Sequence, residues 1–227
     1  MEYISRYMRE GFTAVFSGFP DHHFPKEIAE RLREEITERK SIVFITACPS
    51  EYAQNDEDCD GMHEMFTEIG MPFKEHCVID DRTDPYIAGE LVRNADCIFL
   101  MGGGACVDQL DLIRRKDCLE ALLDSRAAIL GVSAGSMNMA KVTVDHHDSM
   151  EPFEGLGFTD LTVICHCDPE DSWRWEQALR MSEDRVVYAM EDLSAFFLKD
   201  GMINIVGKIR CVENREILLL TSEASPM

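Results

Sequence analysis

The pattern Gly131-Val132-Ser133-Ala134-Gly135 is the strongest chemical signal in the chain. It follows the apolar run AAIL and precedes the helix-compatible segment SMNMAK. A serine on a sharp turn between a strand and a helix stands above the carboxyl edge of a sheet, where its hydroxyl can attack a substrate. The flanking glycines let such a turn close, and the helix N-terminus favours developing negative charge. We predict that Ser133 is a nucleophile; the alternative is a glycine-rich turn with a helix-capping serine.

A second glycine-rich turn, Gly102-Gly103-Gly104, follows the apolar run CIFLM. Backbone N–H groups without side-chain cover can bind a phosphate or an oxyanion. The turn lacks the Lys-Ser/Thr of a P-loop and the glycine spacing of a dinucleotide site. Beside a nucleophilic serine, the better use is an oxyanion hole formed by the N–H of Ala134 and that of Gly103 or Gly104. The alternative is a tight turn alone.

A serine nucleophile needs a general base, and His166 is the preferred candidate. It lies near the carboxyl end of the apolar run TVICHC, where doubly wound sheets gather their sites. His146 and His147 occupy a polar stretch and are expected to be solvated, whereas His22 and His23 could line the pocket.

The sequence Cys165-His166-Cys167 has metal-ligating residue types. Adjacent residues of a strand point to opposite faces, so these three side chains cannot converge on one ion. We therefore expect no metal site and no cofactor.

The base needs an orienting acid, and four carboxylates downstream of Ser133 are candidates: Asp148, Glu151, Asp168 and Glu191. Asp168 follows His166 by two residues and would share its face if the strand continued. Glu191 ends the apolar run RVVYAM. The residues alone leave Glu191 and Asp168 both open.

Short apolar runs alternate with amphipathic segments along the first two thirds of the chain. The near-continuous apolar character of these runs is typical of central parallel strands, and we predict strands at 12–18, 41–47, 75–79, 97–101 and 127–132. The intervening periodicity predicts helices at about 24–39, 60–69, 85–93, 106–124 and 135–141. Repeated β-α units predict a doubly wound, mainly parallel sheet with right-handed crossovers.

The last third has a different pattern. Strands are expected at 162–167 and 185–191, with a helix near 172–183 between them. Residues 194–208 predict a hairpin turning at Asp200-Gly201, and a final strand is expected at 215–220. We expect antiparallel strands to extend one edge of the parallel sheet.

Length and charge limit the class of protein. The 227 residues fit one α/β domain spanning 1–227. Lys and Arg number 22 against 43 Asp and Glu, a net charge of −21, which disfavours nucleic acid and anionic membranes as partners. Nine scattered cysteines without a Cys-x-x-Cys pair, and no apolar stretch of signal-peptide length, predict a cytoplasmic protein with free thiols.

These landmarks occur in the order found in the peptidase E family of serine peptidases, which contains aspartyl dipeptidase and cyanophycinase. The chain resembles that family over roughly 12–210. The landmarks are the two glycine-rich motifs, Gly155-Leu156-Gly157, His166, and Glu191 followed by Ser194-Ala195-Phe196. The resemblance implies a three-layer, class I glutamine amidotransferase-like fold and a Ser-His-Glu triad. By this resemblance Ser133 is the nucleophile, His166 the base and Glu191 its partner, with Gly103 or Gly104 and Ala134 at the oxyanion.

The chain also departs from the family pattern. Ala105 stands where the family often has Asn or Asp, and cysteines flank His166 where the family usually has Pro or Asp before it and an aromatic residue after it. Arg174 lies in a segment where the family places an arginine, which makes it a candidate for substrate binding.

The resemblance implies a serine peptidase that cleaves small peptides through an acyl-enzyme. Two alternatives remain: a non-enzymatic binding protein of the same fold, and an α/β-hydrolase-type esterase, whose usual order is Ser, acid, His. A small peptide is the expected partner, and a homodimer is compatible with the sequence.

Overall fold

The computed structural model describes residues 11–144 and 151–220. Within them, the largest sheet has seven strands in the order β11-β10-β1-β5-β4-β2-β3. Its parallel strands are β1 (Thr13–Phe16), β2 (Ser41–Ile45), β3 (Glu75–Ile79), β4 (Cys97–Leu100) and β5 (Ala128–Val132). The mainly parallel sheet predicted from the apolar runs is confirmed.

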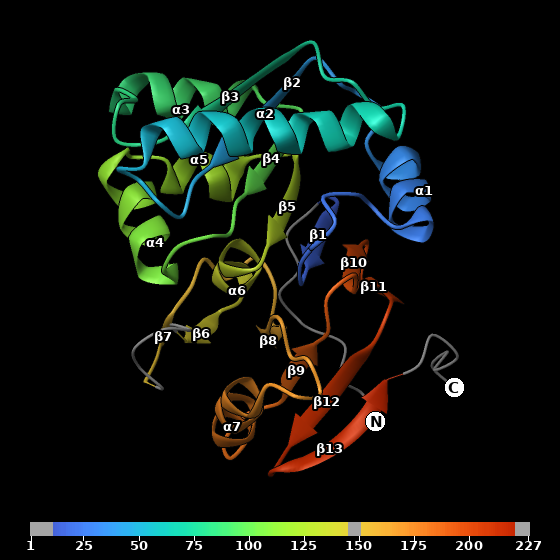
Figure 1. Cartoon of the computed structure of the whole chain (residues 1–227). Helices are drawn as coiled ribbons and strands as arrows, with labels where there is room; N and C mark the ends of the chain where they lie inside the picture. The colour runs from blue at the N-terminus through green and yellow to red at the C-terminus, as the bar shows by residue number, and fades with distance from the viewer. Residues whose placement is uncertain (1–10, 145–150, 221–227) are drawn as a thin grey trace.

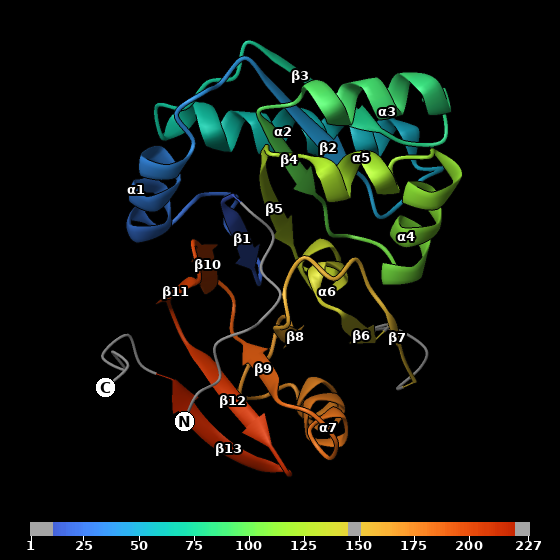
Figure 2. The ribbon, with the colours of Figure 1, turned by 180° about the vertical axis from the view of Figure 1, so that it is seen from behind.

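Helices cover both faces of this sheet. The helices are α1 (Lys26–Glu35), α2 (Tyr52–Glu68), α3 (Pro85–Asn94), α4 (Cys106–Arg115), α5 (Leu119–Asp124) and α6 (Ala134–Met139). Along β2, Ile42 and Phe44 join the core that contains α1 and α2, whereas Val43 and Ile45 join the core that contains α3, α4 and α5. Figure 1 shows α2 in front of the sheet, and Figure 2 shows α3 and α5 in front of it from the opposite side. The arrangement is therefore three-layered, with parallel strands buried on both sides.

Two helices differ from the predicted bounds. α2 begins at Tyr52, earlier than expected. The sequence did not predict this start because the polar first half of the helix buries only Asn55 and Cys59 and therefore shows little apolar periodicity. The predicted helix at 106–124 is divided into α4 and α5. Asp117 lies between them with φ 53°, a left-handed conformation that an α-helix cannot contain.

A hairpin extends the main sheet beyond β1. β10 (Ala195–Lys199) pairs antiparallel with β1, and β11 (Met202–Val206) pairs with β10. The turn falls at Asp200-Gly201, as predicted, and both residues have positive φ.

The remaining C-terminal strands do not join the main sheet, so that part of the prediction was wrong. Among the described residues they form a second sheet in the order β13-β12-β9-β8. Its strands are β8 (Thr162–Ile164), β9 (Val187–Met190), β12 (Ile209–Glu213) and β13 (Glu216–Leu220). The helix α7 (Ser172–Met181) lies between β8 and β9 in the chain. Gly207, with φ 78°, ends the β11 segment and turns the chain into β12, which pairs with β9 instead of continuing the hairpin.

A short ribbon of β6 (Val142–Val144) and β7 (Pro152–Glu154) completes the described structure. No helix within residues 11–144 and 151–220 is both long enough and apolar enough to cross a membrane. The assignment of 1–227 to a single domain remains a prediction.

Candidate active site

Ser133 occupies a strained turn between β5 and α6. Its backbone has φ 53° and ψ −119°, a conformation that costs a non-glycine residue of order 1–3 kcal/mol and is concentrated at functional sites. The turn is held in place because the N–H of Ser133 donates to the carbonyl oxygens of Phe16 at 3.2 Å and Ser17 at 3.1 Å. The end of β1 thus fixes the position of the nucleophile.

The glycines around Ser133 are required by close packing. A Cβ on Gly135 would lie 2.1 Å from the carbonyl oxygen of Leu100, and one on Gly131 would lie 2.6 Å from Met139 Sδ. These distances are shorter than real contacts allow, so only glycine lets α6 approach β4 and β5 this closely.

A hydrogen-bonded chain links the nucleophile to a carboxylate through a histidine. His166 Nε2 lies 2.8 Å from Ser133 Oγ, and His166 Nδ1 lies 2.7 Å from Asp192 Oδ1. The His166 and Asp192 side chains are 36% and 37% exposed, so the chain of groups is open to a substrate. The hydrogen bond with His166 lowers the pKa of Asp192 despite partial burial, which keeps the carboxylate ionised.

The expectation that Glu191 orients His166 is not met. Glu191 Oε1 lies 2.5 Å from Arg210 Nη1, and its Oε2 lies 3.5 Å from Lys208 Nζ. Its N–H donates to the carbonyl of Lys208, which extends the pairing of β9 with β12 by one residue. Glu191 continues the pairing of β9 with β12 and turns toward β12, whereas Asp192 lies in the turn that follows and faces His166.

Asp168, the rival acid, is also displaced from the histidine. β8 ends at Ile164, and His166 has φ 59°, so the strand does not continue as the shared-face argument required. The Asp168 carboxylate is exposed and accepts the N–H of Glu170 at 2.9 Å within a tight turn. Of the other candidate acids, Glu151 is exposed just before β7.

Among the histidines that the structure describes, only His166 is hydrogen-bonded to Ser133. His23 pairs with Glu68 at 2.7 Å on the surface, and His22 is exposed. His146 and His147, like the candidate acid Asp148, lie outside the described residues.

Sequence reasoning missed Ser17 and Gly18 at the carboxyl end of β1. Ser17 is fully buried, and its Oγ accepts the backbone N–H of His166 at 2.8 Å. The same oxygen lies 3.0 Å from the Met190 carbonyl oxygen and 3.4 Å from Asp192 Oδ1. The small, polar Ser-Gly pair directly after an apolar strand was the available signal.

Gly18 leaves the space that His166 and Asp192 occupy. A Cβ at this position would lie 2.4 Å from Asp192 Oδ1 and 2.6 Å from His166 Cε1. Two backbone hydrogen bonds attach the turn containing Asp192 to β1: Leu193 N–H to the Gly18 carbonyl at 2.9 Å, and Ser17 N–H to the Ser194 carbonyl at 3.1 Å. The end of β1 therefore assembles all three members of the hydrogen-bonded chain.

The glycine-rich turn after β4 lies against the nucleophile. A Cβ on Gly102 would lie 2.8 Å from Ser133 Cβ, and one on Gly104 would lie 2.1 Å from the Ala47 carbonyl oxygen. Gly103 has φ 95°. Ala134 is the first residue of α6, where a backbone N–H has no partner within its own helix. Of the predicted oxyanion donors, Ala134 directly follows Ser133, and Gly103 and Gly104 belong to the turn whose first glycine packs against Ser133.

Arg174 lies near Cys165 and Cys167, the two cysteines that flank His166 in the sequence. Burial raises the pKa of the Cys165 thiol well above its usual value and that of Cys167 to about 12, so neither thiol is a competing nucleophile. The guanidinium of Arg174 is close enough to act electrostatically on both thiols. Its buried Nη1 has no hydrogen-bond partner among the described residues.

An α/β fold that presents a strained serine beside a histidine and a carboxylate is the arrangement of a serine hydrolase. The model of peptidase family S51 matches residues 13–206, and the chain belongs to this family. The chain is therefore a serine-type peptidase, and the non-enzymatic and esterase alternatives are set aside.

Two solved structures resemble the fold of this chain over most of its length. A peptidase from an acI-B1 actinobacterium has a TM-score of 0.75 at 16% identity, covering 94% of this chain and 95% of that one. A putative peptidase E protein from Listeria monocytogenes EGD-e has a TM-score of 0.65 at 15% identity, covering 86% and 98%. At these identities the likeness concerns the fold. No curated protein matches the chain significantly.

Proposed function

We propose that this peptidase hydrolyses the peptide bonds of small peptides through a triad of Ser133, His166 and Asp192. The observation that carries the proposal is the continuous chain of hydrogen bonds, 2.8 Å and 2.7 Å long, from Ser133 Oγ through His166 to Asp192. Family membership supports the reaction, and the geometry supports Asp192 as the acid in place of Glu191.

In the proposed reaction, His166 Nε2 accepts the hydroxyl proton as Ser133 Oγ attacks the carbonyl carbon of the scissile bond. The resulting oxyanion is stabilised by backbone N–H groups of Ala134 and of Gly103 or Gly104. The protonated His166 then donates its proton to the leaving amine, and the C–N bond breaks to give an acyl-serine. Water, deprotonated by the same histidine, hydrolyses the acyl-enzyme and restores Ser133.

Asp192 is proposed to orient the histidine and to stabilise its charged form. Its carboxylate accepts Nδ1–H, which leaves Nε2 unprotonated and able to accept the serine proton. Its lowered pKa keeps it negative while His166 is positively charged. Glu191 cannot serve this purpose in the same conformation, because Arg210 and Lys208 hold its two oxygens.

Arg174 is proposed as a substrate-binding residue, as the sequence suggested. Its support is the partnerless Nη1, which could be satisfied by a substrate carboxylate or carbonyl after a side-chain rotation. Arg174→Gln should then raise KM for a cleaved peptide with little effect on kcat. An unchanged KM would remove Arg174 from the proposal.

A fluorophosphonate probe tests the reaction directly, because it forms a covalent bond only with an activated serine. The wild-type protein should be labelled on Ser133, as located by peptide mass spectrometry, and Ser133→Ala should not be labelled. A peptide library digested by the labelled and unlabelled protein then identifies the substrate. An unlabelled but folded wild-type protein would contradict the proposal.

The cytoplasm is the proposed compartment. All nine cysteines lie in the described residues and are free thiols, as expected in a reducing environment.

A further inference from the structure

Cys59, Asp60 and His76 form a cluster at the edge of the sheet farthest from β1. Cys59 and Asp60 are on α2, and His76 is on β3, the edge strand. One donor atom from each residue (a sulfur, an oxygen and a nitrogen) lies within 4.8 Å of the other two. The cluster borders a hollow of about 430 Å³, so a ligand has access to it.

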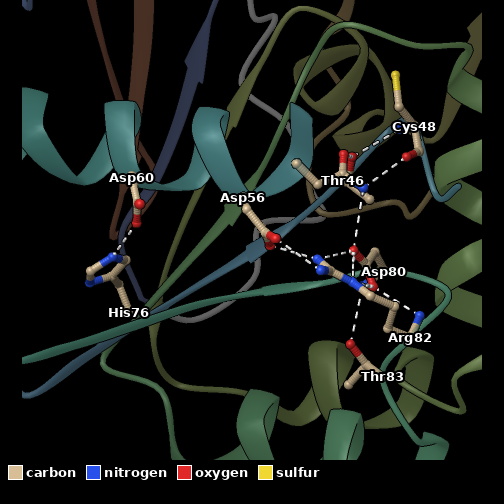
Figure 3. A network of polar contacts seen from close by, with 9 residues as sticks. Thr46, Cys48, Asp56, Asp60, His76, Asp80, Arg82 and Thr83 are labelled. Carbon is tan, nitrogen blue, oxygen red and sulfur yellow. Dashed lines mark hydrogen bonds and ion pairs between the residues drawn. The ribbon is translucent and has the colours of Figure 1, made fainter. Parts of the chain in front are cut away.

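The histidine of this cluster is held in position. His76 Nε2 lies 2.8 Å from Asp60 Oδ1, as Figure 3 shows, across the gap between β3 and α2. The ring of His63 stacks on that of His76, with ring centroids 4.0 Å apart and an interplanar angle of 8°. His63 is itself fixed by a hydrogen bond of 3.1 Å to the Phe73 carbonyl. The imidazole is therefore directed toward Asp60 before any ligand binds.

The thiol of Cys59 lies at the buried side of the cluster. The residue is 4% exposed, and no hydrogen bond to its sulfur is found among the described residues. Burial, the nearby Cys77 thiol and the carboxylates of Asp60 and Asp56 raise its pKa to about 12. The negative potential that disfavours a free thiolate also attracts a cation.

The positive charge of Arg82, in the same hollow, does not strongly oppose the binding of a cation. Arg82 is engaged by two carboxylates, with Nη2 2.6 Å from Asp56 and 2.7 Å from Asp80. Figure 3 shows this ion-pair network beside the Asp60–His76 pair. Its two carboxylates offset the charge of the guanidinium.

We propose that Cys59, Asp60 and His76 bind a divalent cation that accepts mixed sulfur, nitrogen and oxygen ligands, with Zn²⁺ as the best match. Thiolate and imidazole donors disfavour Mg²⁺ and Ca²⁺, which take oxygen ligands. Tetrahedral bond lengths of about 2.0–2.3 Å place donor atoms roughly 3.3–3.7 Å apart, so modest side-chain rotations would close the site. A water molecule completes the coordination.

Binding would release one proton, because the Cys59 thiol must ionise to form the sulfur–metal bond while His76 binds as neutral imidazole. The metal would connect α2 to β3, which has a strand partner on only one side. This departs from our expectation of no metal, which considered only Cys165-His166-Cys167. The proposal does not depend on the peptidase mechanism.

Titration of the full-length, untagged protein with Co²⁺ under reducing conditions tests the site. Thiolate ligation gives a sulfur-to-cobalt charge-transfer band, and tetrahedral coordination gives strong visible bands. Both should saturate at one equivalent and disappear when Zn²⁺ displaces Co²⁺. Nonspecific binding to the acidic surface would not give the charge-transfer band.

Variants assign the ligands. Cys59→Ser should abolish the charge-transfer band, and Asp60→Asn or His76→Gln should each weaken binding by at least about 100-fold. Cys211→Ser is the matched control, because Cys211 is a half-buried free cysteine on β12 of the second sheet and does not line the hollow. Asp60 and His76 are surface-accessible, so their variants remain informative if Cys59→Ser fails to fold.

Absence of the charge-transfer band at saturating Co²⁺ would overturn the proposal, as would a band that survives in Cys59→Ser or is lost in Cys211→Ser. Zn²⁺ should also raise the Tm of the wild-type protein and of Cys211→Ser but not that of His76→Gln. An equal rise in all three proteins would likewise overturn it.

Discussion

Asp192→Asn is the substitution that best tests the proposed triad. In the wild-type protein, Asp192 Oδ1 accepts the proton on His166 Nδ1 at 2.7 Å. An asparagine amide that donates to Nδ1 favours the opposite tautomer, in which the proton sits on Nε2. His166 would then donate to Ser133 Oγ, 2.8 Å away, and could not remove its proton.

The expected loss is large because the geometry stays intact while the chemistry fails. Replacing a triad carboxylate with its amide lowers kcat by about 10⁴. At 1.36 kcal/mol for each factor of ten, this is about 5 kcal/mol of transition-state stabilisation. The readout is the second-order rate of fluorophosphonate labelling of Ser133, which requires no knowledge of the natural peptide.

Glu191→Gln is the matched control. It changes the neighbouring carboxylate in the same way, but it weakens the pairing with Arg210 instead of the contact with His166. Its labelling rate should remain within about threefold of wild type, because a change of this kind removes no transition-state contact. Equal losses in the two variants, or a larger loss in Glu191→Gln, would refute the assignment of Asp192.

Three further predictions follow from the same site. Gly18→Ala should lower the labelling rate by about 100-fold or more, because its Cβ would displace Asp192 and His166; a normal rate would contradict the packing argument. Gly135→Ala should lower Tm in thermal unfolding, since its Cβ would lie 2.1 Å from the carbonyl of Leu100, and an unchanged Tm would show that α6 can shift at no cost. The lowered pKa of Asp192 stabilises the fold above the usual carboxyl pKa of about 3.9, and this contribution is lost as pH falls through the lowered value. Denaturant unfolding of wild type and Asp192→Asn at decreasing pH should therefore show their stability difference shrinking, and a difference independent of pH would count against the Asp192–His166 hydrogen bond.

The parallel sheet and the sharp turn at Ser133 could be predicted because their signals are local. The strands β1 to β5 are short apolar runs, and the pattern around Ser133 combines a strand end, close-packing glycines and a helix start within a few residues. The glycine-rich turn at 102–104 was recognisable for the same reason. Each of these features depends on backbone conformation over one turn or one strand.

The identity of the proposed triad acid could not be predicted, because it depends on the residue at which β9 ends, and the sequence does not reveal that residue. Glu191 and Asp192 are adjacent carboxylates, and the register of β9 decides which of them continues the pairing with β12 and which falls in the turn that faces His166. The pairing of β9 with β12 sets that register, and β12 was not predicted. Asp192 was not among the acids that the sequence suggested, and the directions of both carboxylates were decided by a strand partner that follows them in the chain.

The separate C-terminal sheet and the contribution of Ser17 were likewise decided by long-range pairing. Ser17 and His166 are 149 residues apart, and their contact exists only because β1 ends where the turns after β8 and β9 meet it. The sequence by itself pointed to Ser133, its glycine-rich surroundings and His166, since each carries its own local pattern. Only the tertiary structure selected Asp192, because hydrogen bonds between distant segments determine which of two neighbouring carboxylates faces the base.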